Sequence, residues 1–241
     1  MLHYKIITYK DKTNLEQEKN TMFIDVDGVK TAAGRVFCIG CNYAEHVREL
    51  HGFEEIPPVV FMKPAEALTS PGTLLTPPAG YKDQFDYETE LVFMIGKTGK
   101  ALNEDEAASF VSAIGIGCDL TLRTLQKNLR AKALPWECSK AFENSAPLGV
   151  LHKFDPSVDK LDNLSFRGLV NGEIRQEGNS KDMIYPVKRL IVELSKYWVL
   201  KAGDLIFSGT PQGVGALNNG DKIELIDHRK QSYVWGVEYV Q

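Results

Sequence analysis

The chain has 241 residues, of which 43% are hydrophobic and 25% are charged. That length suits one large domain or two small ones, with enough apolar residues for a core that needs no disulfide bonds. The net charge of −4 argues against a nucleic-acid partner. Apolar runs are too short to cross a bilayer, and residues 1–5 lack a signal-peptide core, so we expect a cytoplasmic protein with no membrane partner.

The first hundred residues favour strands. Residues 1–20 are polar and are expected to form a peripheral strand and loop. Asp27-Gly28 lies between two short apolar runs, which predicts a β-hairpin. Helical spacing of apolar residues predicts a helix within 43–50. Further apolar runs predict strands at residues 34–40, 59–63 and 85–96.

The rest of the chain adds helices between strands. Asn103 is a candidate N-cap for a helix that we expect to run through Ile114. Amphipathic helices are expected over 122–129 and from Pro186 to Trp198. Asn171-Gly172 predicts a second hairpin. Strands are expected at residues 166–170, 173–176, 205–208, 222–226 and 233–240. Many short strands with few helices predict an α+β fold rather than a regular βαβ arrangement.

Two acidic residues at alternate positions of one expected strand are the strongest chemical signal. Glu88 and Glu90 would share one face of the strand and repel each other unless a cation lies between them. A hard divalent cation bound by carboxylate oxygens is the natural candidate, and Asp119 further along the chain supplies a third acid. The alternative is a solvated strand face that carries the acids.

Other polar residues each allow two interpretations. In a helix, His46 and Glu49 would face each other as a general-base pair or as a solvated surface pair. Lys140, between small and aromatic residues, is either buried near an anion or exposed like most lysines.

Residues 209–215 form a Gly-rich stretch without the features of a nucleotide-binding motif. Its backbone amides and the Thr210 hydroxyl could bind an anion, or the stretch is a plain turn. Cys38 and Cys41 have the C-x-x-C spacing of a redox pair or half a zinc site. Reduced structural thiols are the default for all four cysteines.

Together these stretches resemble the fumarylacetoacetate hydrolase family, in its short single-domain branch of acylpyruvase and oxaloacetate-handling enzymes. The matching stretches are residues 42–49, 61–64, 86–96, 118–123, 134–140, 171–176 and 209–215. The resemblance begins near residue 34. We therefore expect residues 1–33 to be an N-terminal extension packed on a catalytic domain formed by residues 34–241.

The resemblance implies a mixed β-sandwich roll with a few peripheral helices, usually a homodimer. It also implies one Mg²⁺ or Mn²⁺ per subunit, held by Glu88, Glu90 and Asp119. It implies that Lys140 is catalytic, that His46 and Glu49 activate water, and that Lys63 supports the site. Implied substrate contacts are Tyr43, Arg123, Gln126 and Thr210. Cys41 stands where family members usually have arginine.

The function implied is metal-dependent chemistry on short 2-oxo or 1,3-diketo acids through an enolate. Acylpyruvate C–C hydrolysis, oxaloacetate decarboxylation and keto–enol tautomerisation all fit this description. One alternative is a hydratase or isomerase of a longer 2-oxo-dienoate from aromatic meta-cleavage. Another is a non-catalytic cation-binding β-roll.

Overall fold

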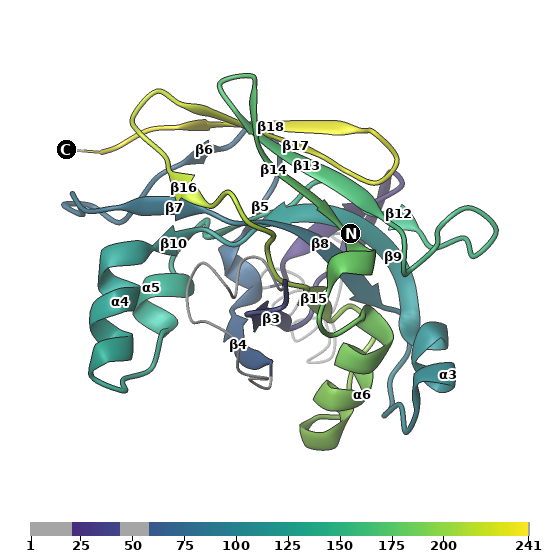
Figure 1. The fold of residues 1–241 in the computed structure, drawn as a ribbon. Helices are drawn as coiled ribbons and strands as arrows, with labels where there is room; N and C mark the ends of the chain where they lie inside the picture. Colours follow the sequence, from purple (N-terminus) through teal and green to yellow (C-terminus); the bar gives the residue numbers. More distant parts are fainter. Residues whose placement is uncertain (1–20, 44–57, 241) are drawn as a thin grey trace, which may run out of the picture.

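The computed structural model describes residues 21–43 and 58–240. Two large sheets dominate these residues (Figure 1). The six-stranded sheet has the order β12 (His152–Lys153), β9 (Val111–Cys118), β8 (Thr89–Ile95), β15 (Leu205–Phe207), β3 (Val36–Gly40) and β4 (Val59–Lys63). The five-stranded sheet has the order β14 (Glu173–Asn179), β13 (Ser165–Val170), β17 (Lys222–Ile226), β18 (Ser232–Val237) and β6 (Leu74–Leu75).

Three smaller sheets and a few helices complete the described fold. The small sheets pair β1 (Phe23–Val26) with β2 (Val29–Ala32), β5 (Leu68–Thr69) with β11 (Ala146–Pro147), and β7 (Phe85–Tyr87) with β10 (Thr121–Leu122) and β16 (Gly215–Ala216). The α-helices are α3 (Glu104–Ala107), α4 (Arg123–Ala131), α5 (Glu137–Lys140) and α6 (Val187–Tyr197). Short 3-10 turns occupy Ala65–Ala67, Ala108–Phe110 and Ser180–Asp182. This architecture confirms the expected α+β class of mixed sheets with few helices.

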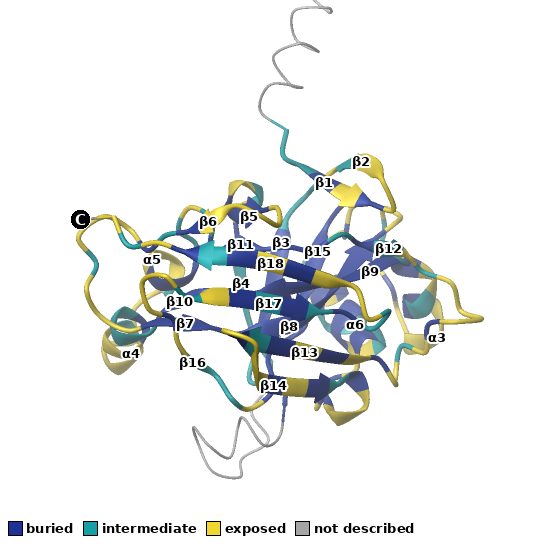
Figure 2. Ribbon diagram, turned by 90° about the horizontal axis from the view of Figure 1, so that it is seen from above, coloured by how far each residue is buried: buried dark blue, intermediate teal, exposed yellow. Residues whose placement is uncertain are grey.

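The hydrophobic core has two parts, one on each face of the six-stranded sheet. In β8, Leu91 and Phe93 point into the larger cluster, which also contains Trp235 of β18. The intervening Val92 and Met94 point into the second cluster. Since both faces of β8 are covered, all seven of its residues are buried. The five-stranded sheet instead alternates buried and exposed residues, because its outer face meets solvent (Figure 2).

Both expected hairpins are confirmed. β1 and β2 pair antiparallel across Asp27-Gly28, and β13 and β14 pair across Asn171-Gly172. Asn171 and Gly172 both have positive φ, 53° and 80°, which this turn requires.

The helix expected from Asn103 to Ile114 is wrong in its length. Asn103 does cap a helix, since its side chain accepts a hydrogen bond from the Glu106 amide at 2.9 Å. The helix ends at Ala107, and β9 begins at Val111 after a 3-10 turn. Long-range pairing decides this segment, because Ile114 lies opposite Phe93 of β8 in the buried sheet. A β-branched residue such as Ile114 also favours a strand over a helix.

The described part of the N-terminal extension packs on the rest of the fold. Ile24 and Val26 join the second hydrophobic cluster, and Val26 bridges to Leu151. Asp27 Oδ1 lies 2.8 Å from His152 Nδ1, within hydrogen-bond distance. The division of the chain at residue 33 stays a prediction.

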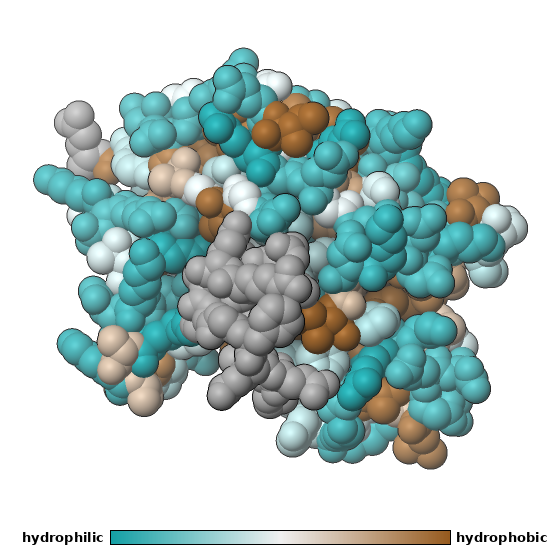
Figure 3. Space-filling view, in the orientation of Figure 1, coloured by the Kyte–Doolittle hydropathy of each residue, from teal (hydrophilic) through white to brown (hydrophobic). Residues whose placement is uncertain are grey.

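The surface facing the reader in Figure 3 is largely hydrophilic, with small and separate hydrophobic patches. Scattered apolar residues of this kind are normal for a protein surface. Among the described residues, the longest helices are too short and too polar to cross a membrane.

Candidate metal centre

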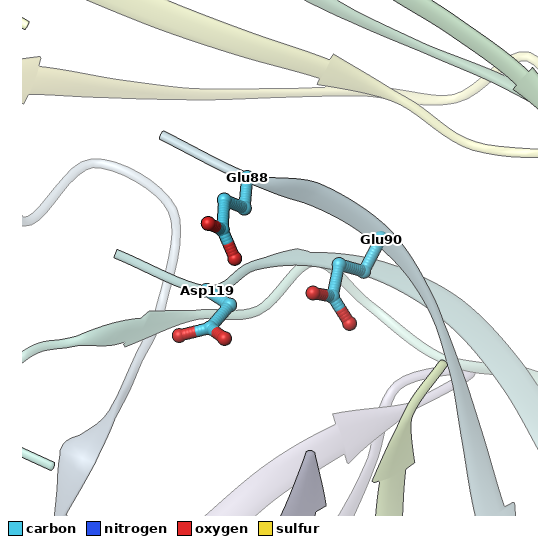
Figure 4. Close-up of side chains that lie close together, drawn as sticks. All are labelled: Glu88, Glu90 and Asp119. Carbon is cyan, nitrogen blue, oxygen red and sulfur yellow. The ribbon is translucent and has the colours of Figure 1, made fainter. Parts of the chain in front are cut away.

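Glu88, Glu90 and Asp119 come together at one end of the β8–β9 strand pair in the six-stranded sheet. One carboxylate oxygen from each lies within 4.8 Å of the others, and this is the one such acidic or metal-ligating group within residues 21–43 and 58–240. Figure 4 shows the three carboxylates gathered around one space. The side chains are buried, with residue exposures of 7%, 1% and 1%. The alternative of a solvated strand face is therefore wrong.

Strand pairing explains the convergence. The expected strand 85–96 is interrupted at Glu88, which lies between β7 and β8. Antiparallel pairing of β8 with β9 brings the end of β9 next to Glu88, and the Asp119 amide donates to the Glu88 carbonyl at 2.8 Å. Glu90 lies opposite Gly117 in the same pair of strands. The sheet register thus brings Asp119 next to Glu88 and Glu90, which are two residues apart in the sequence.

Lys140, at the end of α5, lies among these acids. Its ammonium donates to Glu88 at 2.7 Å, to Asp119 at 2.8 Å and to the Thr121 hydroxyl at 2.6 Å. Burial alone would lower the pKa of Lys140, but the charges of Asp119 and Glu88 outweigh it and hold the pKa above its usual value. Lys140 is thus a buried cation, and the exposed alternative is wrong.

Lys63 is a second buried ammonium beside the group. Its Nζ lies 2.8 Å from Asp119 Oδ1 and donates to the backbone carbonyls of Leu120 and Lys140. Lys63 therefore links β4 to the segment that carries Lys140.

The environments of the two glutamates differ. Burial raises the pKa of Glu88, but Lys140 and Arg123 outweigh it, so the pKa lies below its usual value. Burial, together with Asp119 and Glu88, raises the pKa of Glu90 well above its usual value. Without a nearby cation to balance its charge, the protonated, neutral form of Glu90 is favoured.

Arg123 is the first residue of α4, and its guanidinium lies beside the same cluster. Its Nε donates to Asp86 at 2.7 Å, one Nη donates to Gln126 at 2.6 Å, and the other pairs with Glu88. Arg123 therefore lies beside the acids, and Asp86, which was not expected at the site, joins them. Asp86 precedes Glu88 by two residues, so strand periodicity was a usable signal for it.

The Gly-rich stretch does bind an anion, and the anion is a side chain of this protein. The Gly209 amide donates to Glu90 Oε2 at 2.7 Å. Gly209 has φ 97°, and a Cβ there would lie 2.7 Å from that of Asn42, so glycine is required. The plain-turn interpretation is therefore incomplete.

Thr210 and Gln176 brace the strand between the two glutamates. The Thr210 hydroxyl donates to the Thr89 carbonyl at 2.9 Å and accepts from Gln176 Nε2 at 2.8 Å. Gln176 Oε1 accepts from the Thr89 amide at 2.8 Å. Gln176 belonged to a matching stretch of sequence but was not expected at the site, because its contacts join β14 to β8 across the fold.

A narrow cavity of about 30 Å³ opens onto these groups. Its described lining includes all three acids, Lys140, Arg123, Gln126 and Thr210. Phe61, Arg130 and Trp136 also line it and were not expected. Cys41 lies in the same wall, with φ 60° and a thiol whose pKa is raised by burial.

Three expected residues are not among the described residues of the cavity wall. His46 and Glu49 fall outside the described residues. Tyr43 is not among the described residues of the cavity wall; it is buried and packs edge-on against Phe166, with centroids 6.4 Å apart.

The four cysteines are free thiols. Cys38 is buried in the second hydrophobic cluster, whereas Cys41 lines the cavity. Cys118 is buried and Cys138 is exposed. The structural-thiol interpretation therefore suits Cys38 and Cys118 best.

The donor set fits a hard divalent cation. Four carboxylates face three cationic side chains here, namely Asp86, Glu88, Glu90 and Asp119 against Lys63, Arg123 and Lys140. With all four carboxylates ionised, as a bound cation would favour, the excess is one negative charge. Carboxylate oxygens are the ligands that Mg²⁺ and Mn²⁺ prefer.

Comparison with known proteins identifies the family. The family model described as fumarylacetoacetate (FAA) hydrolase C-terminal matches residues 35–227. The chain belongs to the fumarylacetoacetate hydrolase family. This family member is 37% identical to oxaloacetate tautomerase YcgM of Escherichia coli (strain K12) over 189 residues, 78% of this chain and 86% of that protein.

Solved structures agree. Fumarylpyruvate hydrolase from Pseudomonas aeruginosa, crystallised with Mn²⁺ and pyruvate, gives a TM-score of 0.85 at 33% identity, covering 91% of this chain and 97% of that chain. 5-Carboxymethyl-2-hydroxymuconate delta-isomerase from Mycobacterium smegmatis gives 0.75 at 29% identity, covering 87% and 80%. The expectation of an enzyme of this family is confirmed.

Proposed function

We propose that this chain is a divalent-metal-dependent enzyme acting on short 2-oxo and 1,3-diketo acids through an enolate. The observation that carries the proposal is the buried group of Glu88, Glu90 and Asp119 beside the Lys140 ammonium. Support also comes from the relatives, one named as an oxaloacetate tautomerase and one crystallised with Mn²⁺ and pyruvate as a fumarylpyruvate hydrolase.

We propose that Glu88, Glu90 and Asp119 hold one Mg²⁺ or Mn²⁺ per subunit. The ion, when bound, supplies Lewis-acid polarisation of the substrate's keto oxygen. Lys63 keeps the Asp119 carboxylate in place through its 2.8 Å ion pair. Lys140 is placed to stabilise negative charge that develops on the enolate oxygen.

The substrate's carboxylate is proposed to bind at Arg123, whose planar guanidinium suits it. Asp86 and Gln126 orient this guanidinium. Gln126 and Thr210 are proposed further contacts, since both line the cavity. Tyr43 stays a proposal from the family resemblance.

His46 and Glu49 are proposed to activate the water that hydrolysis requires. In hydrolysis, water adds across the C–C bond of an acylpyruvate and releases a carboxylic acid and pyruvate. Tautomerisation and decarboxylation of oxaloacetate need no attacking water. We therefore expect His46→Ala to abolish acylpyruvate hydrolysis while leaving most oxaloacetate turnover, measured by initial rates on both substrates. Equal loss of both activities would contradict this division of roles.

The deciding experiment follows acetylpyruvate and oxaloacetate by their ultraviolet enol absorbance, with Mn²⁺ or with EDTA. Loss of absorbance that depends on the metal supports the proposal, and detection of acetate, pyruvate or CO₂ identifies the reaction. No loss of either substrate in the presence of Mn²⁺ would refute it.

A second candidate is isomerisation or hydration of a longer 2-oxo-dienoate. The likeness to the Mycobacterium smegmatis isomerase favours it. Turnover of such dienoates without turnover of acetylpyruvate or oxaloacetate would select this function.

The homodimer and the cytoplasmic location stay predictions. We propose the dimer because the family resemblance implies it, and light scattering of the purified protein at several concentrations tests it.

A further inference from the structure

Asn42 lies where two parallel strands of the six-stranded sheet end. β3 and β15 pair in parallel, with Phe207 opposite Cys38. Asn42 comes two residues after β3, and Ser208 comes directly after β15. Because parallel strands run in the same direction, their carboxyl ends lie side by side. Asn42 is therefore next to the peptide that joins Ser208 to Gly209.

The side chain of Asn42 is buried, and both ends of its amide are hydrogen-bonded. Oδ1 accepts from the Tyr185 amide at 2.7 Å. Nδ2 donates to the Tyr185 carbonyl at 3.1 Å and to the Ser208 carbonyl at 2.7 Å. Since a donor faces one end of the amide and two acceptors face the other, this network fixes the orientation of the Asn42 side chain.

The Ser208–Gly209 peptide connects Asn42 to Glu90. Its carbonyl accepts from Asn42 Nδ2, and its amide donates to Glu90 Oε2 at 2.7 Å. A peptide unit is planar, so holding the direction of the carbonyl also holds the direction of the N–H on the opposite side. The hydrogen bond to the carbonyl also strengthens the N–H as a donor, because linked hydrogen bonds polarise one another.

Ser208 and Gly209 do not hold this peptide by themselves. The Ser208 amide and hydroxyl both donate to the Leu91 carbonyl, at 3.1 and 2.9 Å, and these bonds precede the peptide in question. Gly209 has φ 97° and no side chain that would restrict its backbone. The hydrogen bond from Asn42 thus controls the direction in which the Gly209 amide points.

We propose that Asn42 is a positioning residue for the metal site, which it serves by aiming the Gly209 amide at the Glu90 carboxylate. This inference rests on the proposed function, in which Glu90 is a metal ligand. Asn42 is not among the described residues of the cavity wall, so it acts through the peptide. Removal of a group that orients a metal ligand typically lowers metal affinity 10–100-fold.

The test compares Asn42→Ala, the control Ser195→Ala and the wild type. Ser195 is buried in α6 and accepts from the Ala101 amide at 3.0 Å, so the control also removes a buried hydrogen bond. Calorimetric Mn²⁺ titration should show at least about tenfold weaker binding to Asn42→Ala. Ser195→Ala should bind Mn²⁺ as the wild type does. Circular dichroism confirms that each protein is folded.

Asn42→Ser serves as a second variant in case Asn42→Ala does not fold. Its hydroxyl takes the place of the Asn42 Cγ, one bond short of the amide nitrogen, so we expect the same loss of Mn²⁺ affinity. Wild-type affinity in a folded Asn42 variant, or an equal loss in Ser195→Ala, overturns the proposal.

Hydrogen exchange of the Gly209 amide gives a readout without metal. In protein labelled with isotopic glycine and kept in EDTA, this amide should exchange with deuterium at least about tenfold faster in the Asn42 variant than in Ser195→Ala and the wild type. Equal exchange in all three proteins overturns the positioning role. If the wild type binds no Mn²⁺, the proposed function is wrong, and exchange of the Gly209 amide alone then decides whether Asn42 holds the peptide.

Discussion

Glu90 differs from the other two acids of the cluster in what balances its charge. Glu88 and Asp119 pair with Lys140, whereas Glu90 accepts a hydrogen bond from the Gly209 amide. Burial and the neighbouring acids raise the pKa of Glu90. The ionised form of Glu90 is therefore unfavourable in this buried position unless a cation is bound nearby. A buried acid with a strongly perturbed pKa is typical of a ligand-binding site.

Replacement of Glu90 by glutamine should weaken metal binding without destabilising the fold. Glu90→Gln removes a charged ligand while keeping its shape, so we expect Mn²⁺ affinity to fall about 100-fold or more. The melting temperature in EDTA should not fall, because a buried charge is removed. Calorimetric Mn²⁺ titration and thermal melts measure both. Glu177→Gln, at an exposed position of β14, is the control. Wild-type affinity in Glu90→Gln would contradict the ligand role.

Gln176 is expected to matter for stability as well as for the site. Gln176→Ala leaves the buried Thr89 amide without its acceptor and removes the donor to Thr210. The expected loss is about 1–3 kcal/mol of unfolding free energy. Urea unfolding measures it, with Gln231→Ala at an exposed position as the control. A variant as stable as the control would show that water replaces these bonds.

At the scale of elements, pairing between distant segments overrides local preference. β9 forms where the helix capped by Asn103 was expected to continue to Ile114, because β8 lies beside it. Long-range hydrogen bonding likewise links the loop before β13 to the turn between β17 and β18. There Asp159 accepts from Arg229 at 2.8 Å and from the Asp155 amide at 2.9 Å.

The hydrogen bonds that Asp159 accepts should make the free energy of unfolding depend on pH. Burial raises the pKa of Asp159, but Arg229 and the Asp155 amide outweigh it, so the pKa lies below its usual value. A carboxyl whose pKa is lower in the folded state than in the unfolded state stabilises the fold. This contribution is complete at pH values above the unfolded-state pKa, and it is lost as the pH falls through the folded-state pKa. Asp159→Asn should therefore cost about 1–3 kcal/mol at pH 7 and progressively less below about pH 4.

Urea unfolding of Asp159→Asn and the wild type at pH 7 and from pH 5 to 3 measures this dependence. Asp162→Asn, at an exposed position of the same loop, is the control. His228 Nε2 also faces Asp159, at 3.2 Å, and burial lowers the pKa of His228, so protonation of this imidazole contributes to the pH dependence of both proteins. A difference that stays constant down to pH 3 would contradict the assignment to Asp159.

For the whole molecule, the acids join β8 and β9 of the central sheet, so a bound cation should stabilise the entire fold. A ligand that binds the folded state alone adds about 2.7 kcal/mol at 100 times its Kd. For a chain of this size that corresponds to about 5–10 °C in Tm. Thermal melts with Mn²⁺ and with EDTA test this. No shift in the wild type, or an equal shift in Glu90→Gln, would contradict a metal site at the triad.

Local patterns in the sequence determined a large part of this protein. Turn chemistry at Asp27-Gly28 and Asn171-Gly172 predicted both hairpins, because a two-residue turn with positive φ depends on its own residues. The apolar run after Glu90 predicted β8, and alternate acids indicated a cation site. Motif resemblance identified the family, which the match over residues 35–227 confirmed.

Tertiary structure decided what depends on neighbours far apart in the sequence. Burial of Lys140 among Glu88 and Asp119, and the bracing of Thr89 by Gln176, follow from sheet register and not from local spacing. The end of α3 at Ala107 has the same cause. Arg130 and Trp136 joined the site because α4 and the segment after it fold against the cavity. A charge or a ring acquires such a role through its three-dimensional neighbours, which a one-dimensional pattern does not contain.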